Sequence, residues 1–130
     1  QYILLGTLDK GLFLINKETG ESKKLQIDES RNSDIYVRHI EKISKDEYWV
    51  GAESGIYVLK DGAVQHITYE AYNDLSISDN AIYALFKDRE GGIWVGSYFG
   101  GVDYIPKQYS YFENFYPIKT LLAVTESENL

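Results

Sequence analysis

The sequence offers few side chains that could carry out catalysis. It contains no cysteine, which excludes thiolate nucleophiles, disulfides and cysteine-based zinc sites. Its two histidines, His39 and His66, fall on different predicted strands. Neither has the spacing to a serine, a carboxylate pair or a second ligand that a catalytic triad or a metal site needs. We therefore interpret both as structural or solvated residues, and we expect no catalysis, no metal and no cofactor in this chain.

Several predicted loops carry aromatic and polar side chains that suit binding. Tyr98 and Phe99 lie between two predicted strands, beside two glycines, where a role in the core is hard to assign. Aromatic platforms beside amide, carboxylate and guanidinium groups are typical of sugar-binding sites. Asp79 and Asn80 would also suit the turn that precedes a strand. The predicted ligand-binding residues are Tyr98, Phe99, Arg38, Asp79, Asn80 and Glu53.

A repeat of constant length places these residues on equivalent loops. Gly6, Gly51 and Gly96 each end a short apolar segment, and they are 45 residues apart (6 to 51 and 51 to 96). Trp49 and Trp94 stand two residues before the second and third of these glycines. A period in the mid-forties is typical of a four-stranded propeller blade. We expect the tryptophans to pack between blades, and Gly51 and Gly96 to allow a close backbone approach or a bulge.

Each repeat contains strand-sized segments separated by turn residues. Apolar residues occupy consecutive positions in the middle strands, as expected where both faces of a sheet are covered by neighbours. The sequence therefore predicts an all-β fold: a β-propeller fragment with about three four-stranded antiparallel blades in an incomplete ring. The predicted blades are residues 1–28, which lack the inner strand, 35–69 and 79–117, with 119–127 as a candidate inner strand of a further blade.

Three blades are too few to close a ring, since propellers have four to eight. We expect the remaining blades of a parent propeller, or head-to-tail copies of this chain, to cover the open ends. The last strand of the third blade is predicted over residues 109–116. Its aromatic residues are interpreted as an outer packing seam or a dimer contact, and they are Tyr111, Phe112, Phe115 and Tyr116.

The charge of the chain argues against nucleic acid as a partner. Its 13 basic and 20 acidic residues give a net charge of −7, which repels phosphate, and no basic stripe reverses this locally. No apolar run reaches the roughly 18 to 20 residues that span a bilayer, so we expect no membrane contact within this chain.

A resemblance to a known family lies at residues 88–97, which read Asp-Arg-Glu-Gly-Gly-Ile-Trp-Val-Gly-Ser, with Gly-Gly-Val at 100–102. This run resembles the two-component regulator propeller repeat. The second copy keeps Trp49-Val50-Gly51 but lacks the glycine of the Asp-x-x-Gly turn, and the first has Leu4 in place of the tryptophan. The resemblance implies a large periplasmic propeller in a hybrid two-component sensor with a histidine kinase, which responds to an oligosaccharide.

Two other functions remain open at this point. A propeller glycan lyase or hydrolase would need an acid and a base around the channel, and the visible repeats do not show such a pair. A scaffold that binds another protein would expose apolar loops instead of polar ones. The ligand-sensing module, which the family resemblance implies, is the leading interpretation.

Overall fold

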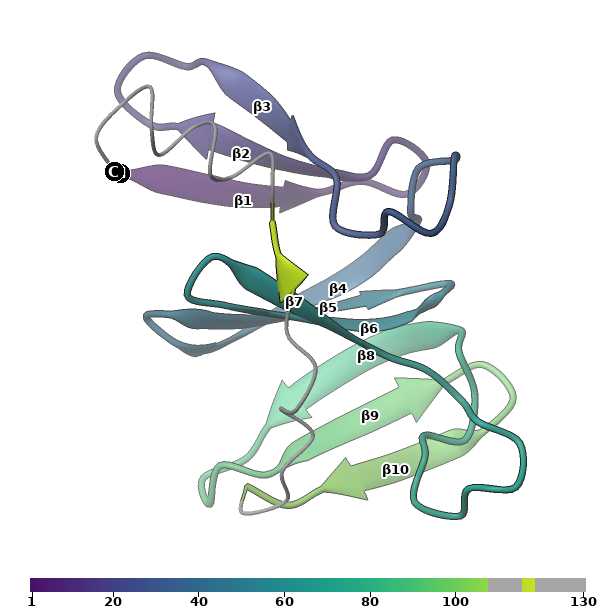
Figure 1. Ribbon diagram of the computed structural model, residues 1–130. Coiled ribbons are helices and arrows are strands. Elements are labelled where there is room, and N and C mark those ends of the chain that lie inside the picture. The colour runs from purple at the N-terminus through teal and green to yellow at the C-terminus, as the bar shows by residue number, and fades with distance from the viewer. Residues whose placement is uncertain (108–115, 119–130) are drawn as a thin grey trace.

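The computed structural model describes residues 1–107 and 116–118 of the chain. Within these residues the protein forms three antiparallel sheets that stack face to face, and it has no helix (Figure 1). The stack does not close on itself. This architecture confirms the predicted all-β propeller fragment with an incomplete ring.

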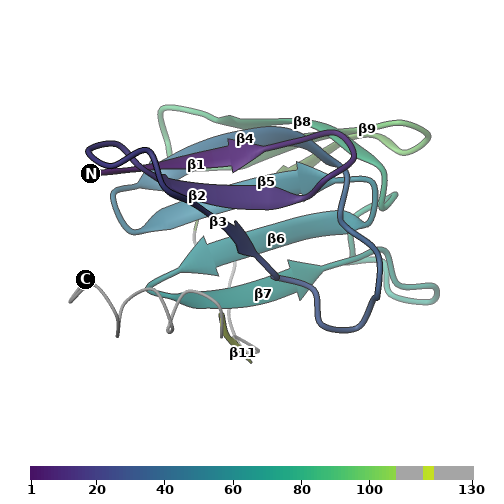
Figure 2. The same cartoon turned by 90° about the horizontal axis from the view of Figure 1, so that it is seen from above.

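Consecutive strands lie side by side in each sheet, and β11 (Tyr116–Pro117) adds a further strand to the second sheet at its β7 edge. The first is β1 (Tyr2–Gly6), β2 (Leu12–Asn16) and β3 (Ser22–Leu25). The second is β4 (Val37–Ser44), β5 (Glu47–Ala52), β6 (Gly55–Lys60) and β7 (Ala63–Ile67). The third is β8 (Ile82–Lys87), β9 (Ile93–Ser97) and β10 (Gly101–Ile105). Seen from above, β1, β4 and β8 lie on one side of the stack and β7 on the other (Figure 2).

The interior consists of two separate apolar layers, one on each face of the second sheet. Val50 and Tyr57 of the second sheet pack towards the first sheet, against Leu12. Their neighbours Trp49 and Ile56 point the other way and pack against the third sheet. Successive side chains of a strand point to opposite faces, so two covered faces require apolar residues at consecutive positions. This explains why β5 and β6 lack the alternation of a half-exposed strand.

The glycine that marks each repeat lies where the next sheet approaches. A Cβ atom on Gly51 would be 2.8 Å from Cγ2 of Ile82, which lies in the third sheet. Gly6 lies in the same way against Val37 of the second sheet. Gly96 is open, since its nearest neighbour is Cβ of Ala84 in its own sheet at 3.8 Å. Gly6 and Gly51 therefore allow one blade to contact the inner strand of the following blade.

The strand predicted over 109–116 lies outside the described residues except for Tyr116, which pairs with the second sheet. Strand β11 (Tyr116–Pro117) pairs antiparallel with β7, where Tyr116 faces Val64. The backbone N–H of Ile118 donates to the carbonyl of Gly62 at 2.9 Å. The Ile118 side chain is buried in the layer between the first and second sheets. Burial of this one apolar residue, together with the free edge of β7, accounts for the pairing.

Other expectations for the C-terminal region lie outside the described residues. These are the aromatic residues Tyr111, Phe112 and Phe115 and the candidate inner strand at 119–127. Within the described part of the chain, no helix is long and apolar enough to cross a membrane.

Candidate functional site

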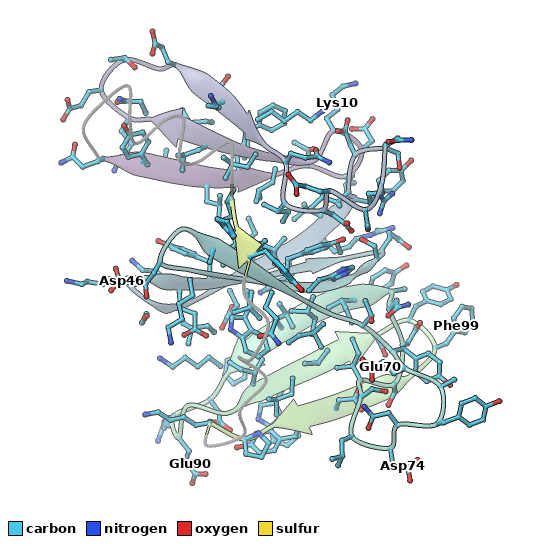
Figure 3. The ribbon with its side chains drawn as sticks, in the orientation of Figure 1. Lys10, Asp46, Glu70, Asp74, Glu90 and Phe99 are labelled. Carbon is cyan, nitrogen blue, oxygen red and sulfur yellow. The ribbon has the colours of Figure 1, made fainter. Side chains whose placement is uncertain are left out.

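One end of the stack gathers the loops that sequence analysis selected for binding. The β5–β6 and β9–β10 loops lie there, beside the starts of β4 and β8 (Figure 1). Phe99 projects from the β9–β10 loop at this end, whereas Glu90 lies at the opposite end (Figure 3). The repeated order of strands brings equivalent loops of successive blades next to each other.

A β-bulge turns one residue of each inner strand out of the ladder. In the second sheet, Val37 faces Ala52 and His39 faces Gly51, so Arg38 is the extra residue. In the third sheet the pairing between β8 and β9 shifts in the same way around Tyr83. A bulged residue has no partner across the ladder and re-aims its side chain. Arg38 and Tyr83 therefore occupy equivalent places in consecutive blades.

Five side chains form a continuous series of contacts at this end, and we name them the mouth cluster: Glu53, Arg38, Tyr83, Tyr98 and Phe99. Arg38 forms an ion pair with Glu53, and its Cζ atom lies 4.8 Å from the centre of the Tyr83 ring. The rings of Tyr83 and Tyr98 meet edge to face at 5.4 Å, and those of Tyr98 and Phe99 at 4.4 Å. The second and third blades thus share one surface.

Asp79 and Asn80 accept hydrogen bonds from different segments of the chain. Asp79 accepts a hydrogen bond from the backbone N–H of Phe99 at 2.9 Å, so it holds the β9–β10 loop beside the start of β8. The side-chain oxygen of Asn80 accepts from the backbone N–H of Tyr69 at 2.6 Å. Of the six predicted residues, the structure links five through contacts or hydrogen bonds, while Asn80 ties the chain segment after β7 to the start of β8.

Residues 76–99 match the family model described as "Two component regulator propeller". The chain carries a two-component regulator propeller repeat. The matched segment includes Asp79 and the third-blade members of the mouth cluster, Tyr83, Tyr98 and Phe99.

Two solved structures from B. thetaiotaomicron are similar to the chain. One is the extracellular domain assigned to the hybrid two component system BT4673, with a TM-score of 0.68 and 24% sequence identity over 81% of this chain and 14% of that one. The other is the extracellular domain assigned to the hybrid two component system BT3049, with a TM-score of 0.64 and 29% identity over 82% of this chain and 13% of that one. The chain thus spans about one seventh of each. A comparison with curated proteins gave no match.

The propeller repeat displays its aromatic residues to solvent. Phe99 is 85% exposed, Tyr98 57% and Tyr83 43%. Arg38 and Glu53 neutralise each other, and the carboxylate of Asp79 is occupied by backbone N–H groups. The mouth cluster therefore offers an uncharged aromatic ledge with polar groups at one side. Adjacent exposed apolar side chains of this kind mark interaction sites.

Tyr83 is the functional candidate that sequence analysis missed. It lies inside a predicted strand, where alternation assigns it an ordinary place in the ladder. The bulge depends on the pairing with β9, which local sequence does not reveal. A signal was present nevertheless, because Tyr83 and Arg38 are separated by the 45-residue period.

A second polar cluster lies between the first and second blades. The ring of His66 stacks on Tyr57 at 4.2 Å, and its Nδ1 atom is 3.8 Å from Oδ2 of Asp28. Asp28 is only 6% exposed, and it accepts a hydrogen bond from the Tyr57 hydroxyl at 2.5 Å. Ser30 also donates to Asp28, through its backbone N–H and its hydroxyl. This carboxylate comes from another blade, which is why sequence analysis found none near His66.

The Asp28 cluster has the hydrogen-bonding pattern of a structural contact. Burial raises the pKa of Asp28, but hydrogen bonds from Ser30 and Tyr57 and the nearby His66 outweigh burial and hold this pKa below its ordinary value. Burial and the bond to Asp28 raise the pKa of the Tyr57 hydroxyl far above its ordinary value. The tyrosine therefore remains a hydrogen-bond donor and the aspartate an acceptor across the seam between the blades.

The lowered pKa of Asp28 predicts a specific loss of stability in acid. A carboxyl group whose folded pKa is lowered stabilises the fold above its unfolded pKa of about 3.9, and this contribution is lost as the pH falls through the folded value. Asp28→Asn should therefore cost about 1–3 kcal/mol at pH 7, because Tyr57 loses a charged acceptor. The difference from wild type should shrink below about pH 4. Urea unfolding over a pH series measures both.

The exposed Asp74, which points away from the sheets in Figure 3, supplies the control for this experiment. Asp74→Asn should leave stability at pH 7 nearly unchanged, within about 0.5 kcal/mol. If the free energies of unfolding of wild type and Asp28→Asn fell in parallel as the pH is lowered, this would contradict the role given to the buried carboxylate.

Proposed function

We propose that the chain belongs to a ligand-sensing propeller in the periplasmic part of a hybrid two-component sensor kinase. In this proposal the propeller responds to an oligosaccharide and catalyses no reaction. The similarity to extracellular domains of hybrid two-component systems supports a sensor module outside the cytoplasm. The mouth cluster is the observation that carries the proposal for ligand binding.

The chemistry of the mouth cluster fits a sugar ring. A pyranose presents an apolar face of C–H groups and a rim of hydroxyls, so it pairs with an aromatic ledge flanked by polar side chains. Tyr98 and Phe99 supply exposed ring faces and edges. Arg38 and Glu53 supply a donor and an acceptor within reach of the same surface. Binding sites of this type combine apolar walls with a few oriented polar groups.

A loss of binding on removal of the most exposed ring tests this function. Phe99→Ala should weaken oligosaccharide binding at least about five-fold, since truncation of an aromatic contact of this kind typically costs more than about 1 kcal/mol. Its melting temperature should stay near that of wild type, because the ring contributes to neither apolar layer. The measurement is calorimetry with an oligosaccharide panel on the extracellular region that contains this chain.

Tyr72→Ala is the matched control, because Tyr72 is a fully exposed aromatic residue on the β7–β8 connection and is not a member of the mouth cluster. Equal affinities for Phe99→Ala and Tyr72→Ala would contradict binding at the mouth. Product formation in the same experiment would favour a glycan lyase or hydrolase, and capture of a protein without any sugar binding would favour a scaffold.

Two uncovered apolar faces support the proposal that further blades complete the ring. Ile3 and Leu5 are exposed on the first sheet. On the third sheet, Trp94, Val102 and Tyr104 are exposed at positions equivalent to buried residues of the second sheet. Exposed apolar areas of this kind are normally covered by another protein surface. In this proposal the remaining blades of the parent propeller cover both faces.

The same faces predict that the isolated chain self-associates, with one copy stacked head to tail on the next. Light scattering should give a weight-average mass that rises with concentration from the 14.9 kDa of one chain. Trp94→Lys, which places a charge on the open face, should lower that mass. A constant monomeric mass over the whole concentration range would refute this assembly.

A further inference from the structure

Two positions in each blade recur with the full period and meet at the mouth. The bulge residues Arg38 and Tyr83 are 45 residues apart, and so are the first loop residues Glu53 and Tyr98. In the second blade the bulge residue contacts the loop residue through an ion pair. In the third blade the same two positions contact through an edge-to-face pair of rings. The second and third blades therefore share the position of this contact but differ in its chemistry, which is ionic in one and aromatic in the other.

The backbone holds these positions independently of their side chains. The N–H of Glu53 donates to the carbonyl of Tyr36 at 3.1 Å. The N–H of Tyr98 donates to the carbonyl of Ala81 at 2.9 Å, one period later. Each loop is thereby tied to the residue two positions before the bulge, and no side chain takes part. The side chains at the two positions are consequently free to change.

We propose that the bulge residue and the first loop residue of each blade form a recognition pair that sets ligand specificity at the mouth. This inference rests on the proposed function, and it adds Tyr83 as a specificity-determining residue. None of the four side chains belongs to either buried apolar layer. The Arg38–Glu53 pair contacts hydroxyl groups of the ligand, and the Tyr83–Tyr98 pair contacts its apolar face.

The two pairs act on neighbouring parts of one ligand. The guanidinium of Arg38 lies over the ring of Tyr83, so the ionic pair of the second blade touches the aromatic pair of the third. A cation that faces an aromatic ring is attracted to it, and this contact fixes the guanidinium on the open surface. The ligand that fits is therefore a short chain of sugars that spans both blades.

The ion pair also determines which charge the ligand can carry. Glu53 neutralises Arg38, so the present mouth favours an uncharged saccharide. Glu53→Gln keeps the size of the side chain and exposes the positive charge of Arg38. The variant should then bind a saccharide that carries carboxylates more tightly than wild type does.

Calorimetry with a neutral oligosaccharide panel and with oligogalacturonate tests the pair, on the extracellular region that contains this chain. Glu53→Gln should bind oligogalacturonate about five-fold more tightly than wild type at low salt, as one charge at contact distance predicts. Added salt should reduce this gain. Glu90→Gln changes the net charge equally at the opposite end of the stack, and it should bind like wild type. Equal affinities of Glu53→Gln and Glu90→Gln for oligogalacturonate would overturn the proposal.

A second variant tests the exchangeability of the pair without any ligand. Arg38→Tyr combined with Glu53→Tyr gives the second blade the aromatic pair of the third. Its melting temperature should shift by less than about 2 °C, because neither side chain is in a core. A fall of more than about 8 °C would show that the pair is structural and would overturn the proposal. The proposed function fails separately, if wild type binds no member of the panel.

Discussion

Trp49→Ala should lower the free energy of unfolding by about 3–5 kcal/mol, the usual cost of truncating a large buried aromatic residue. Trp49 is 2% exposed and packs in the layer between the second and third sheets. Its indole N–H donates to Glu47 at 2.7 Å, so the substitution also removes a charge-assisted hydrogen bond. Urea denaturation followed by circular dichroism measures the loss.

Trp94 is the control that the repeat itself supplies. It occupies the equivalent position one period later, yet it is 44% exposed and contacts Tyr104 of its own sheet. Trp94→Ala should cost about 1 kcal/mol or less, as expected for a residue with one open face. If Trp49→Ala does not fold, Trp49→Phe gives the same ranking with a smaller loss. Similar losses for the two tryptophans would contradict packing between blades as the function of this residue.

Gly51→Ala should be destabilising by about 1–3 kcal/mol, although it adds a single methyl group, because it overpacks the seam between two blades. The new Cβ atom would lie 2.8 Å from Cγ2 of Ile82, which is closer than non-bonded carbon atoms approach each other in proteins. In Gly96→Ala the nearest atom to the new Cβ, Cβ of Ala84, would lie 3.8 Å away in ordinary contact, so this variant should be nearly neutral in the isolated chain. Thermal or urea unfolding of the two variants provides the comparison.

A double substitution separates overpacking from other effects of the alanine. Ile82→Ala removes the Cγ2 atom that the new methyl group meets, so the cost of Gly51→Ala should be reduced in an Ile82→Ala background. The interaction energy of the pair should then be at least about 0.5 kcal/mol in the relieving direction. Strict additivity of the two substitutions would show that the clash is absent.

Repetition made the fold accessible from sequence. The glycines at 6, 51 and 96 recur at a constant interval, so one interpretation of their spacing applied to three segments at once. The grouping of the candidate binding loops followed from strand order alone, since connections of one type share an end of the stack. Arg38, Glu53, Tyr98, Phe99 and Asp79 meet there in contacts or hydrogen bonds.

Features that depend on pairing between distant segments could not be predicted from the sequence. The bulge at Tyr83 is a property of two strands, and one strand alone does not reveal it. Asp28 reaches His66 only because two blades stack, and the sequence contains no sign of their relative position. The pairing of Tyr116 with Val64 in the second sheet likewise depends on a distant contact. Ile118 is buried in the apolar layer between the first and second sheets.

The second sheet contributes one side of both apolar layers, and this determines the order in which the sheets unfold. The first and third sheets each pack against the second sheet with one face only, through separate sets of residues. Loss of an end sheet therefore leaves the opposite layer intact, whereas melting of the middle sheet dissolves both. Stability in such an array is a sum over neighbours, and fraying starts at the ends. We therefore expect the isolated chain to lose its first and third sheets independently, with a last cooperative unit centred on β5 and β6.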